Sequence, residues 1–135
     1  MHLFHHTYTD PKKNIDVEKS LLEQVNLGHY PAGIMRLWES STYFVVLGLS
    51  KKIIDDVHEQ NCINDGIPIL KRCSGGGTVL QGPGCFNYSY ILPIGLNDQL
   101  SSLNQTTTYI LNLVKDTLSS KVSGISLSGI SDLAI

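Results

Sequence analysis

The stretch from Lys71 to Gly84, KRCSGGGTVLQGPG, combines a basic pair with consecutive glycines, and it is the part of the sequence best suited to chemistry. Glycine lets a ligand approach the bare backbone, and consecutive backbone N–H groups form an anion-binding concavity. Arg72 adds a fork of donors that fits phosphate or carboxylate, and Ser74 and Thr78 add hydroxyl groups. The stretch is therefore suited to hold a phosphate, a carboxylate or a mixed anhydride of the two. The alternative is a hairpin loop without a ligand, since glycine-rich turns are common.

Two familiar phosphate-binding motifs do not describe this stretch. No GK[ST] sequence follows the glycines, so the lysine of a P-loop is absent, and the spacing does not match the dinucleotide fingerprint GxGxxG. A long loop between two apolar segments is nevertheless a common place for function.

The first half of the chain is expected to supply one helix and two strands around this loop. Residues 14–28 place Ile15, Leu22 and Val25 on one helical face, with Asn14 or Asp16 as the N-cap and Gly28 at the end. Residues 33–40 and 42–50 are rich in β-branched and aromatic side chains, which is typical of strands. The polar segment 39–42 is short enough to join them as a hairpin.

The second half continues the mixture of helices and strands. Residues 51–66 predict a short helix, residues 67–73 a strand that enters the glycines, and residues 85–94 a strand stopped by Pro93. Residues 101–120 predict the clearest helix, capped by Ser101 or Ser102, and residues 122–135 alternate enough to form a strand. These elements favour an α/β chain of the α+β type, with a mixed, largely antiparallel sheet and flanking helices.

Length and composition limit the class of protein. The chain has 135 residues, which is about one domain, so a single domain over 1–135 is expected. Its net charge of −2 argues against a broad nucleic-acid surface. Three cysteines without CxxC spacing, Cys62, Cys73 and Cys85, suit a reducing cytosol. No signal peptide or membrane span is evident, so a cytoplasmic location is expected.

The sequence RCSGGGTVLQGPGCFNYSYIL resembles the signature of the lipoate–protein ligase A family, which belongs to the biotin/lipoate protein ligase superfamily. Other stretches of the chain agree with this resemblance. NIDVEKSLLEQV is similar to the first helix of the family, IMRLWESSTYFVVLGLSK to its next two strands, and GISDLAI to the strand that precedes its catalytic lysine. The resemblance covers nearly the whole chain from Asn14 onward.

The resemblance implies a fold related to biotin–protein ligases and class II synthetases. It implies ATP-dependent activation of lipoate or octanoate to an acyl-adenylate, with Mg²⁺, and transfer to a lysine of a carrier domain. The carriers would be lipoyl domains of 2-oxoacid dehydrogenases or the glycine cleavage H protein, with no nucleic-acid or membrane partner. Carried over to this sequence, the nucleotide- and substrate-binding residues would be Arg72, Ser74, Gly75, Gly76, Gly77, Thr78, Val79, Leu80, Asn87 and Asp132.

The sequence departs from the family at three places. Lys71 stands where arginine is commoner, which keeps the charge but not the fork of donors. Gln81 stands where many members carry a histidine, and the GxKxxG-like stretch with the catalytic lysine does not occur in residues 1–135. The resemblance therefore predicts the N-terminal portion of a catalytic domain, incomplete at its C-terminus. Such a chain is expected to be inactive alone and prone to self-association through an exposed sheet edge. The alternatives are an octanoyl or lipoyl transferase of the same superfamily, or a non-catalytic binding remnant.

Overall fold

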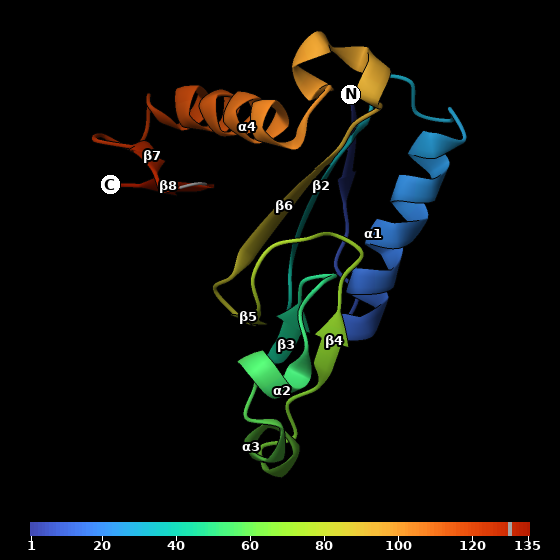
Figure 1. Cartoon of the computed structure of the whole chain (residues 1–135), viewed down its shortest axis with the longest axis vertical. Helices are drawn as coiled ribbons and strands as arrows, with labels where there is room; N and C mark the ends of the chain where they lie inside the picture. Colours follow the sequence, from blue (N-terminus) through green and yellow to red (C-terminus); the bar gives the residue numbers. More distant parts are fainter. Residues whose placement is uncertain (130) are drawn as a thin grey trace. The chain divides into compact units, whose positions relative to one another are not determined.

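The computed structural model contains two compact units, Met1–Pro93 and Ile94–Ile135 (Figure 1). The structure describes residues 1–129 and 131–135, so one position of the strand predicted over residues 122–135 lies outside the described residues. A single domain over residues 1–135 stays a prediction.

The first sheet of the first unit contains β1 (His2–His5), β2 (Ile34–Glu39) and β6 (Phe86–Ile91), in the order β1-β2-β6. β2 pairs in parallel with β1 and antiparallel with β6. Successive side chains of a strand point to opposite faces, and every second residue of β2, Ile34, Arg36 and Trp38, is buried. A charged side chain therefore lies among the apolar residues of this face.

The second sheet places β3 (Phe44–Leu47) between two partners, β4 (Ile69–Lys71) and β5 (Val79–Gln81). β4 is parallel to β3 and β5 is antiparallel to it. The predicted hairpin over residues 39–42 is wrong, because β2 and β3 belong to different sheets. Ser40, which is buried, donates to the carbonyl of Thr42 and accepts from its N–H, and this tight corner turns the chain from one sheet into the next.

Helix α1 (Pro11–Asn26) begins three residues earlier than the sequence predicts. Asp10 is the N-cap, its side chain accepts from the N–H of Lys12, and Pro11 fits the first helical position. The prediction of Asn14 or Asp16 as the cap is wrong: Asn14 is fully buried inside the helix, where it holds the backbone of Tyr8 through two hydrogen bonds. Gly28, at φ 81°, ends the helix as expected.

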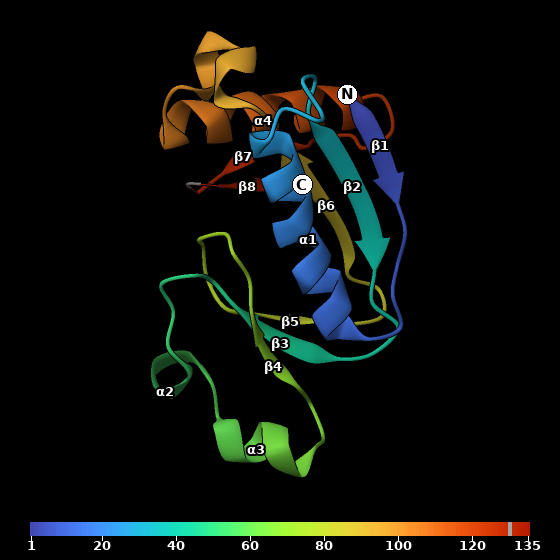
Figure 2. The same cartoon turned by 90° about the vertical axis from the view of Figure 1, so that its right-hand side faces the viewer.

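One face of α1 packs on the strands of this unit, and Figure 2 shows the helix running along β2 and β6. Near its start, Ile15 packs with Trp38, Phe44 and Val46. Near its end, Val25 packs with Ile34 and Ile91. Because Trp38 is on β2 and Val46 on β3, the first turns of α1 meet residues from both sheets.

The segment predicted as one helix over residues 51–66 forms two, α2 (Ile53–Asp56) and α3 (Glu59–Asn64). The break is at Val57, which has extended dihedrals (φ −135°, ψ 133°). A β-branched residue is stiff at χ1 and favours the extended conformation, so Val57 suits this position.

The second unit contains two short 3₁₀ turns, η1 (Ile94–Leu96) and η2 (Asp98–Leu100), then α4 (Leu103–Leu118) and the antiparallel pair β7 (Ser126–Ser128) and β8 (Asp132–Ala134). Ser102 caps α4, as the sequence predicts. Of the described helices, none combines the length and apolar character needed to cross a membrane. The pairing of parallel and antiparallel strands with flanking helices confirms the predicted fold class.

Candidate binding site

The guanidinium of Arg72 holds the glycine-rich loop in shape. Its Nη2 donates to the carbonyls of Gly75 (2.7 Å) and Gly77 (2.8 Å), and its Nε donates to Gly75 at 3.1 Å. Its Nη1 lies 3.5 Å from the carbonyl of Val46 on β3. The fork predicted to bind a ligand therefore binds backbone carbonyls of its own loop and of the neighbouring strand.

Two glycines allow the loop to lie against the end of β3. Gly76 has φ 94°, a conformation that L-residues with a side chain rarely adopt. Gly48, directly after β3, is buried, and a Cβ there would overlap the carbonyl oxygen of Gly76. The N–H of Leu49 also donates to the carbonyl of Ser74 at 2.9 Å. The loop is therefore packed on the sheet through bare backbone.

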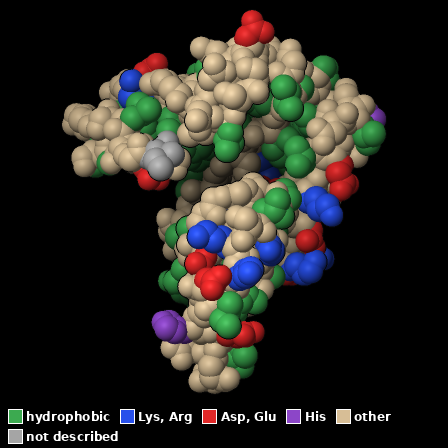
Figure 3. All heavy atoms as spheres, in the orientation of Figure 1, with side chains coloured by type: hydrophobic (Ala, Val, Ile, Leu, Met, Phe, Trp, Pro, Cys, Tyr) green, Lys and Arg blue, Asp and Glu red, His purple; other side chains and the backbone are tan. Residues whose placement is uncertain are grey.

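The far end of the loop is tied to α2. The hydroxyl of Thr78 donates to Oδ2 of Asp56 at 2.6 Å, and Nζ of Lys51 lies 3.8 Å from the same oxygen. Lys71 donates to the carbonyl of Lys51 at 3.2 Å. Figure 3 shows basic and acidic side chains intermingled on this part of the surface. Thr78 therefore supports the loop from outside.

A pocket of about 210 Å³ lies inside the first unit, beside this loop. Residues from α1, from the loop and from four strands line it: Ile15, Glu18, Trp38, Val46, Arg72, Ser74, Val79, Gln81, Asn87, Tyr88 and Ser89. Four of these residues are apolar and seven are polar or charged, so the pocket offers an apolar side and many hydrogen-bonding groups to a small molecule.

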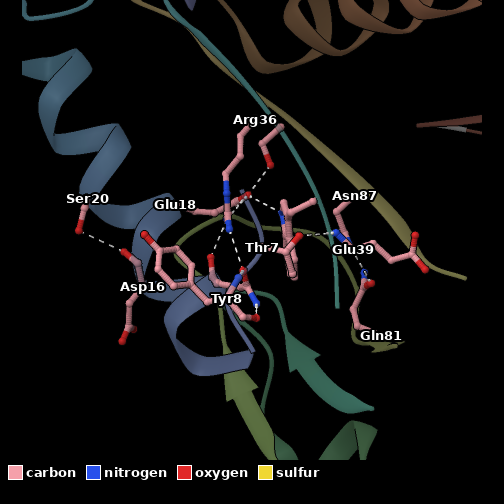
Figure 4. Close-up of polar contacts among 12 residues, drawn as sticks. Thr7, Tyr8, Asp16, Glu18, Ser20, Arg36, Glu39, Gln81 and Asn87 are labelled. Carbon is pink, nitrogen blue, oxygen red and sulfur yellow. Dashed lines mark hydrogen bonds and ion pairs between the residues drawn. The ribbon is translucent and has the colours of Figure 1, made fainter. Parts of the chain in front are cut away.

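Glu18 gathers three donors at one wall of the pocket. Its Oε1 accepts from Ser89 Oγ at 2.6 Å, from Arg36 Nη1 at 3.1 Å and from Trp38 Nε1 at 3.2 Å. Figure 4 shows Arg36 and Glu18 pointing toward each other from β2 and α1. The charge of the carboxylate is thus compensated and its position is fixed from two strands.

Arg36 is completely buried, and it also contacts Asn14 and the ring of Trp38. Nη1 donates to the carbonyl of Asn14 at 2.6 Å and Nη2 to its Oδ1 at 3.1 Å, while the guanidinium carbon lies 4.8 Å from the centre of the Trp38 ring. Burial lowers the pKa of Arg36, and the neighbouring Glu18 opposes this change. Nε makes no hydrogen bond with any described group.

A pair of amides forms another part of the pocket lining. Nδ2 of Asn87 donates to the carbonyl of Cys85 at 2.8 Å and to Oε1 of Gln81 at 3.1 Å. A backbone carbonyl only accepts, so the contact with Cys85 identifies the nitrogen of the Asn87 amide. The atom of Gln81 that faces this nitrogen must then be the oxygen.

The structure brings only part of the predicted residue set to the pocket. Arg72, Ser74, Val79 and Asn87 line it. The remaining residues of the first unit do not: the glycines 75–77 and Thr78 make the loop contacts described above, and the side chain of Leu80 is 56% exposed. Asp132 lies on β8 in the second unit and is exposed. A role in binding stays a prediction for all of them.

The polar wall of the pocket was not predicted from the sequence; it is Glu18 with its donors Arg36, Trp38 and Ser89. The apolar patterns of α1 and β2 nevertheless contain a sign of it. Glu18 lies three residues after Ile15 and four before Leu22, so it is a charge within the apolar stripe of α1. Arg36 alternates with Ile34 and Trp38 in the same way. A charge on a face that must be buried needs a partner, and these two charges are each other's partner.

The comparisons with known proteins identify the family of the chain. The family model of the lipoyl protein ligase A/B catalytic domain matches residues 10–135, so the chain belongs to this family. A protein of Aeropyrum pernix named "Putative lipoate-protein ligase A" is 31% identical over 83 residues, which is 62% of this chain and 30% of that protein.

Solved structures show the same fold. P. falciparum LipL1 in complex with lipoate matches with a TM-score of 0.71 at 19% identity, covering 98% of this chain and 40% of that one. A T. acidophilum protein, Ta0514, with bound lipoic acid matches with 0.66 at 16% identity, covering 99% of this chain and 58% of that one. A bi-partite lipoate protein ligase of Thermoplasma acidophilum, described together with its E2 lipoyl domain, matches with a TM-score of 0.59 at 16% identity, covering 99% of this chain and 50% of that one. The chain spans between 30% and 58% of the length of these relatives.

Proposed function

We propose that the first unit binds lipoate or octanoate together with the nucleotide of an acyl-adenylate, as part of a lipoate–protein ligase. The complete reaction would join the acyl carboxylate to the α-phosphate of ATP, with pyrophosphate leaving. A lysine amine of a lipoyl carrier domain would then attack the acyl carbon and displace AMP. Family membership supports this reaction class, and the relatives described with lipoate, lipoic acid and an E2 lipoyl domain support the choice of substrate and carrier.

The observation that carries the proposal is the pocket beside the glycine-rich loop. Ile15, Val46 and Val79 give it apolar walls suited to a hydrocarbon chain, while Ser74, Gln81 and Asn87 add polar groups. Its volume of about 210 Å³ lies below the roughly 300–1,000 Å³ typical of pockets for drug-sized ligands, so it is too small for a whole adenylate. The acyl group is therefore assigned to the pocket, and the nucleotide to the loop.

Magnesium has no ready-made centre in the described residues. Among them, no three His, Cys, Asp or Glu side chains are grouped to hold a metal ion. Mg²⁺ is therefore proposed only as the counter-ion that accompanies ATP, and no step is assigned to it.

The test of the proposal is calorimetric titration of the chain with lipoate, AMP and a sulfamoyl analogue of lipoyl-adenylate. We expect lipoate and the analogue to bind, and Val79→Glu to weaken both by about tenfold or more. Val79 is 43% exposed without a ligand, and the carboxylate would replace an apolar contact with the acyl chain. Leu80→Glu is the matched control, because Leu80 follows Val79 on β5, points to the opposite face and does not line the pocket. If the wild-type chain binds none of the three probes, the proposal is wrong.

A second assay separates the ligase from an octanoyl or lipoyl transferase. Release of pyrophosphate from ATP that depends on lipoate is expected for the ligase in its complete form. Acyl transfer from an acylated carrier protein without ATP would favour the transferase instead.

A further inference from the structure

The polar groups of the pocket differ in whether they are already engaged. Arg72, the strongest donor near the loop, donates to the carbonyls of Gly75 and Gly77 within 2.8 Å. Ser89 donates to Glu18 at 2.6 Å. A group whose donors already have good partners gains little by turning to a ligand.

Three polar side chains of the lining keep a free donor among the described residues: the hydroxyls of Ser74 and Tyr88 and the amide of Gln81. Gln81 is the one of these whose orientation is fixed by a neighbouring side chain. Its Oε1 accepts from Asn87, whose own orientation is fixed by the carbonyl of Cys85. The oxygen of the Gln81 amide therefore has a partner, and what remains is an Nε2 with two hydrogens. This nitrogen makes no hydrogen bond within the part of the chain that the structure describes, and Gln81 lines the pocket.

We infer that Nε2 of Gln81 donates a hydrogen bond to an anionic oxygen of the ligand, and that Asn87 is a positioning residue that holds the amide in the donating orientation. The inference rests on the proposed function, and it names a specificity-determining residue of that site. The oxygen belongs either to the acyl carboxyl group or to the phosphate of the nucleotide. These two sources share the same chemistry, so the probes must distinguish them.

The local charges explain why an uncharged donor suits this place. The charged or titratable groups that line the same pocket are Glu18 on α1, Arg72 after β4 and Tyr88 on β6. Gln81 donates without adding a charge beside the Arg36–Glu18 pair, and its amide does not titrate. Any pH dependence of this contact would therefore come from the ligand oxygen and not from Gln81.

The first experiment removes the donor while keeping the size of the side chain. We expect Gln81→Met to lose roughly 10- to 100-fold in affinity for the sulfamoyl analogue, which is the range for a hydrogen bond to a charged group. If the acceptor is the acyl carboxyl oxygen, lipoate loses affinity to the same extent and AMP does not. If it is the phosphate, the reverse holds. Gln60→Met is the matched control, because Gln60 forms an exposed amide pair with Asn64 on α3, outside the pocket.

The second experiment tests the positioning role of Asn87 by a double-mutant cycle. Asn87→Leu releases the Gln81 amide, so it should weaken binding in the wild-type background and have no further effect in Gln81→Met. Circular dichroism and urea unfolding show whether each variant is folded.

Gln81→Glu serves as a second variant of the same size. At neutral pH this carboxylate can only accept and would repel the anion, so it should bind more weakly than Gln81→Met.

The possible outcomes distinguish the inference from the proposed function. If the wild-type chain binds none of the probes, both are wrong. If the wild-type chain binds and folded Gln81→Met binds every probe equally well, the inference alone is wrong. Additive effects in the double-mutant cycle would contradict the positioning role of Asn87.

Discussion

Two arginines of the first unit lie beside the same pocket, and they are held in opposite ways. Arg36 is buried and is bound by a carboxylate and an amide from α1, and the ring of Trp38 on its own strand covers its guanidinium. Arg72 is half-buried, and its contacts are backbone carbonyls, most of them from residues three to five positions ahead. Arg36 therefore joins α1 to the sheet, whereas Arg72 shapes a loop. The first should affect global stability, and the second local order.

Arg36→Met is expected to have the largest effect on stability. It leaves Glu18 without its cation and removes one donor from each oxygen of Asn14, so we expect about 3–5 kcal/mol of lost stability in urea unfolding. Lys12→Met, which removes an exposed ion pair with Asp16 on the same helix, is the control and should change little. Equal losses in the two variants would show that the buried pair is not what joins α1 to β2.

Gly48→Ala tests how closely the Arg72 loop is packed on the sheet. The added Cβ would overlap the carbonyl of Gly76, so the loop must shift, and overpacking of this kind costs about 1–3 kcal/mol. We expect lower stability and weaker binding of lipoate. In Gly77→Ala the Cβ would meet nothing within 4 Å, so this variant should be close to neutral. A neutral Gly48→Ala would mean that the loop does not rest on β3.

Arg72→Met tests whether this arginine orders the loop. Loss of its partly exposed hydrogen bonds should reduce stability by only about 1 kcal/mol. The hydrogen-exchange rates of the amides of residues 74–78 should increase, while those of β2 should stay nearly unchanged, because the effect is local. Cys73→Ala, a small change beside it, is the control. Unchanged exchange in the loop would remove Arg72 from this role.

The smallest effect is expected from Thr78→Val, which removes the hydrogen bond to Asp56 but keeps the shape of the side chain. The contact is exposed, so the change should stay below about 1 kcal/mol. Exchange of the amides near the start of β5 should increase slightly while binding of lipoate stays within twofold. A loss comparable with that of Gly48→Ala would show that the tie to α2 is as important as the packing on β3.

The sequence predicts much of the fold because its local patterns are strong. The alternation in residues 85–94 and the periodicity of residues 101–120 lead to β6 and α4 nearly where the structure has them. The pairing of the strands could not be predicted, because it depends on the corner at Ser40 and on contacts between distant segments. The glycine-rich motif led to the loop and to four residues of the pocket.

The polar wall around Glu18 and the amide pair of Gln81 and Asn87 could not be predicted from the glycine-rich motif, for a physical reason. Glu18 and Ser89 are 71 positions apart and meet only because α1 packs on β6. The side-chain fork of Arg72 looks like a ligand-binding group in the sequence, and only the loop conformation shows that it binds carbonyls. A residue type identifies what a side chain can do, while the fold decides which of its atoms remain available.

The placement of β3 between β4 and β5 sets a minimum span for the glycine-rich loop. β4 runs parallel to β3 and ends at the same end of the sheet, while β5 starts there on the other side of β3, so residues 72–78 must arch across two strand spacings, about 9.5 Å. Seven residues can span more than twice that distance, so the loop has length to spare for its contacts with Arg72 and β3. An inserted glycine would widen the arch. Deletion of Gly75 would draw β5 forward by one position and turn Val79 and Gln81 away from the pocket, to the opposite face of the sheet.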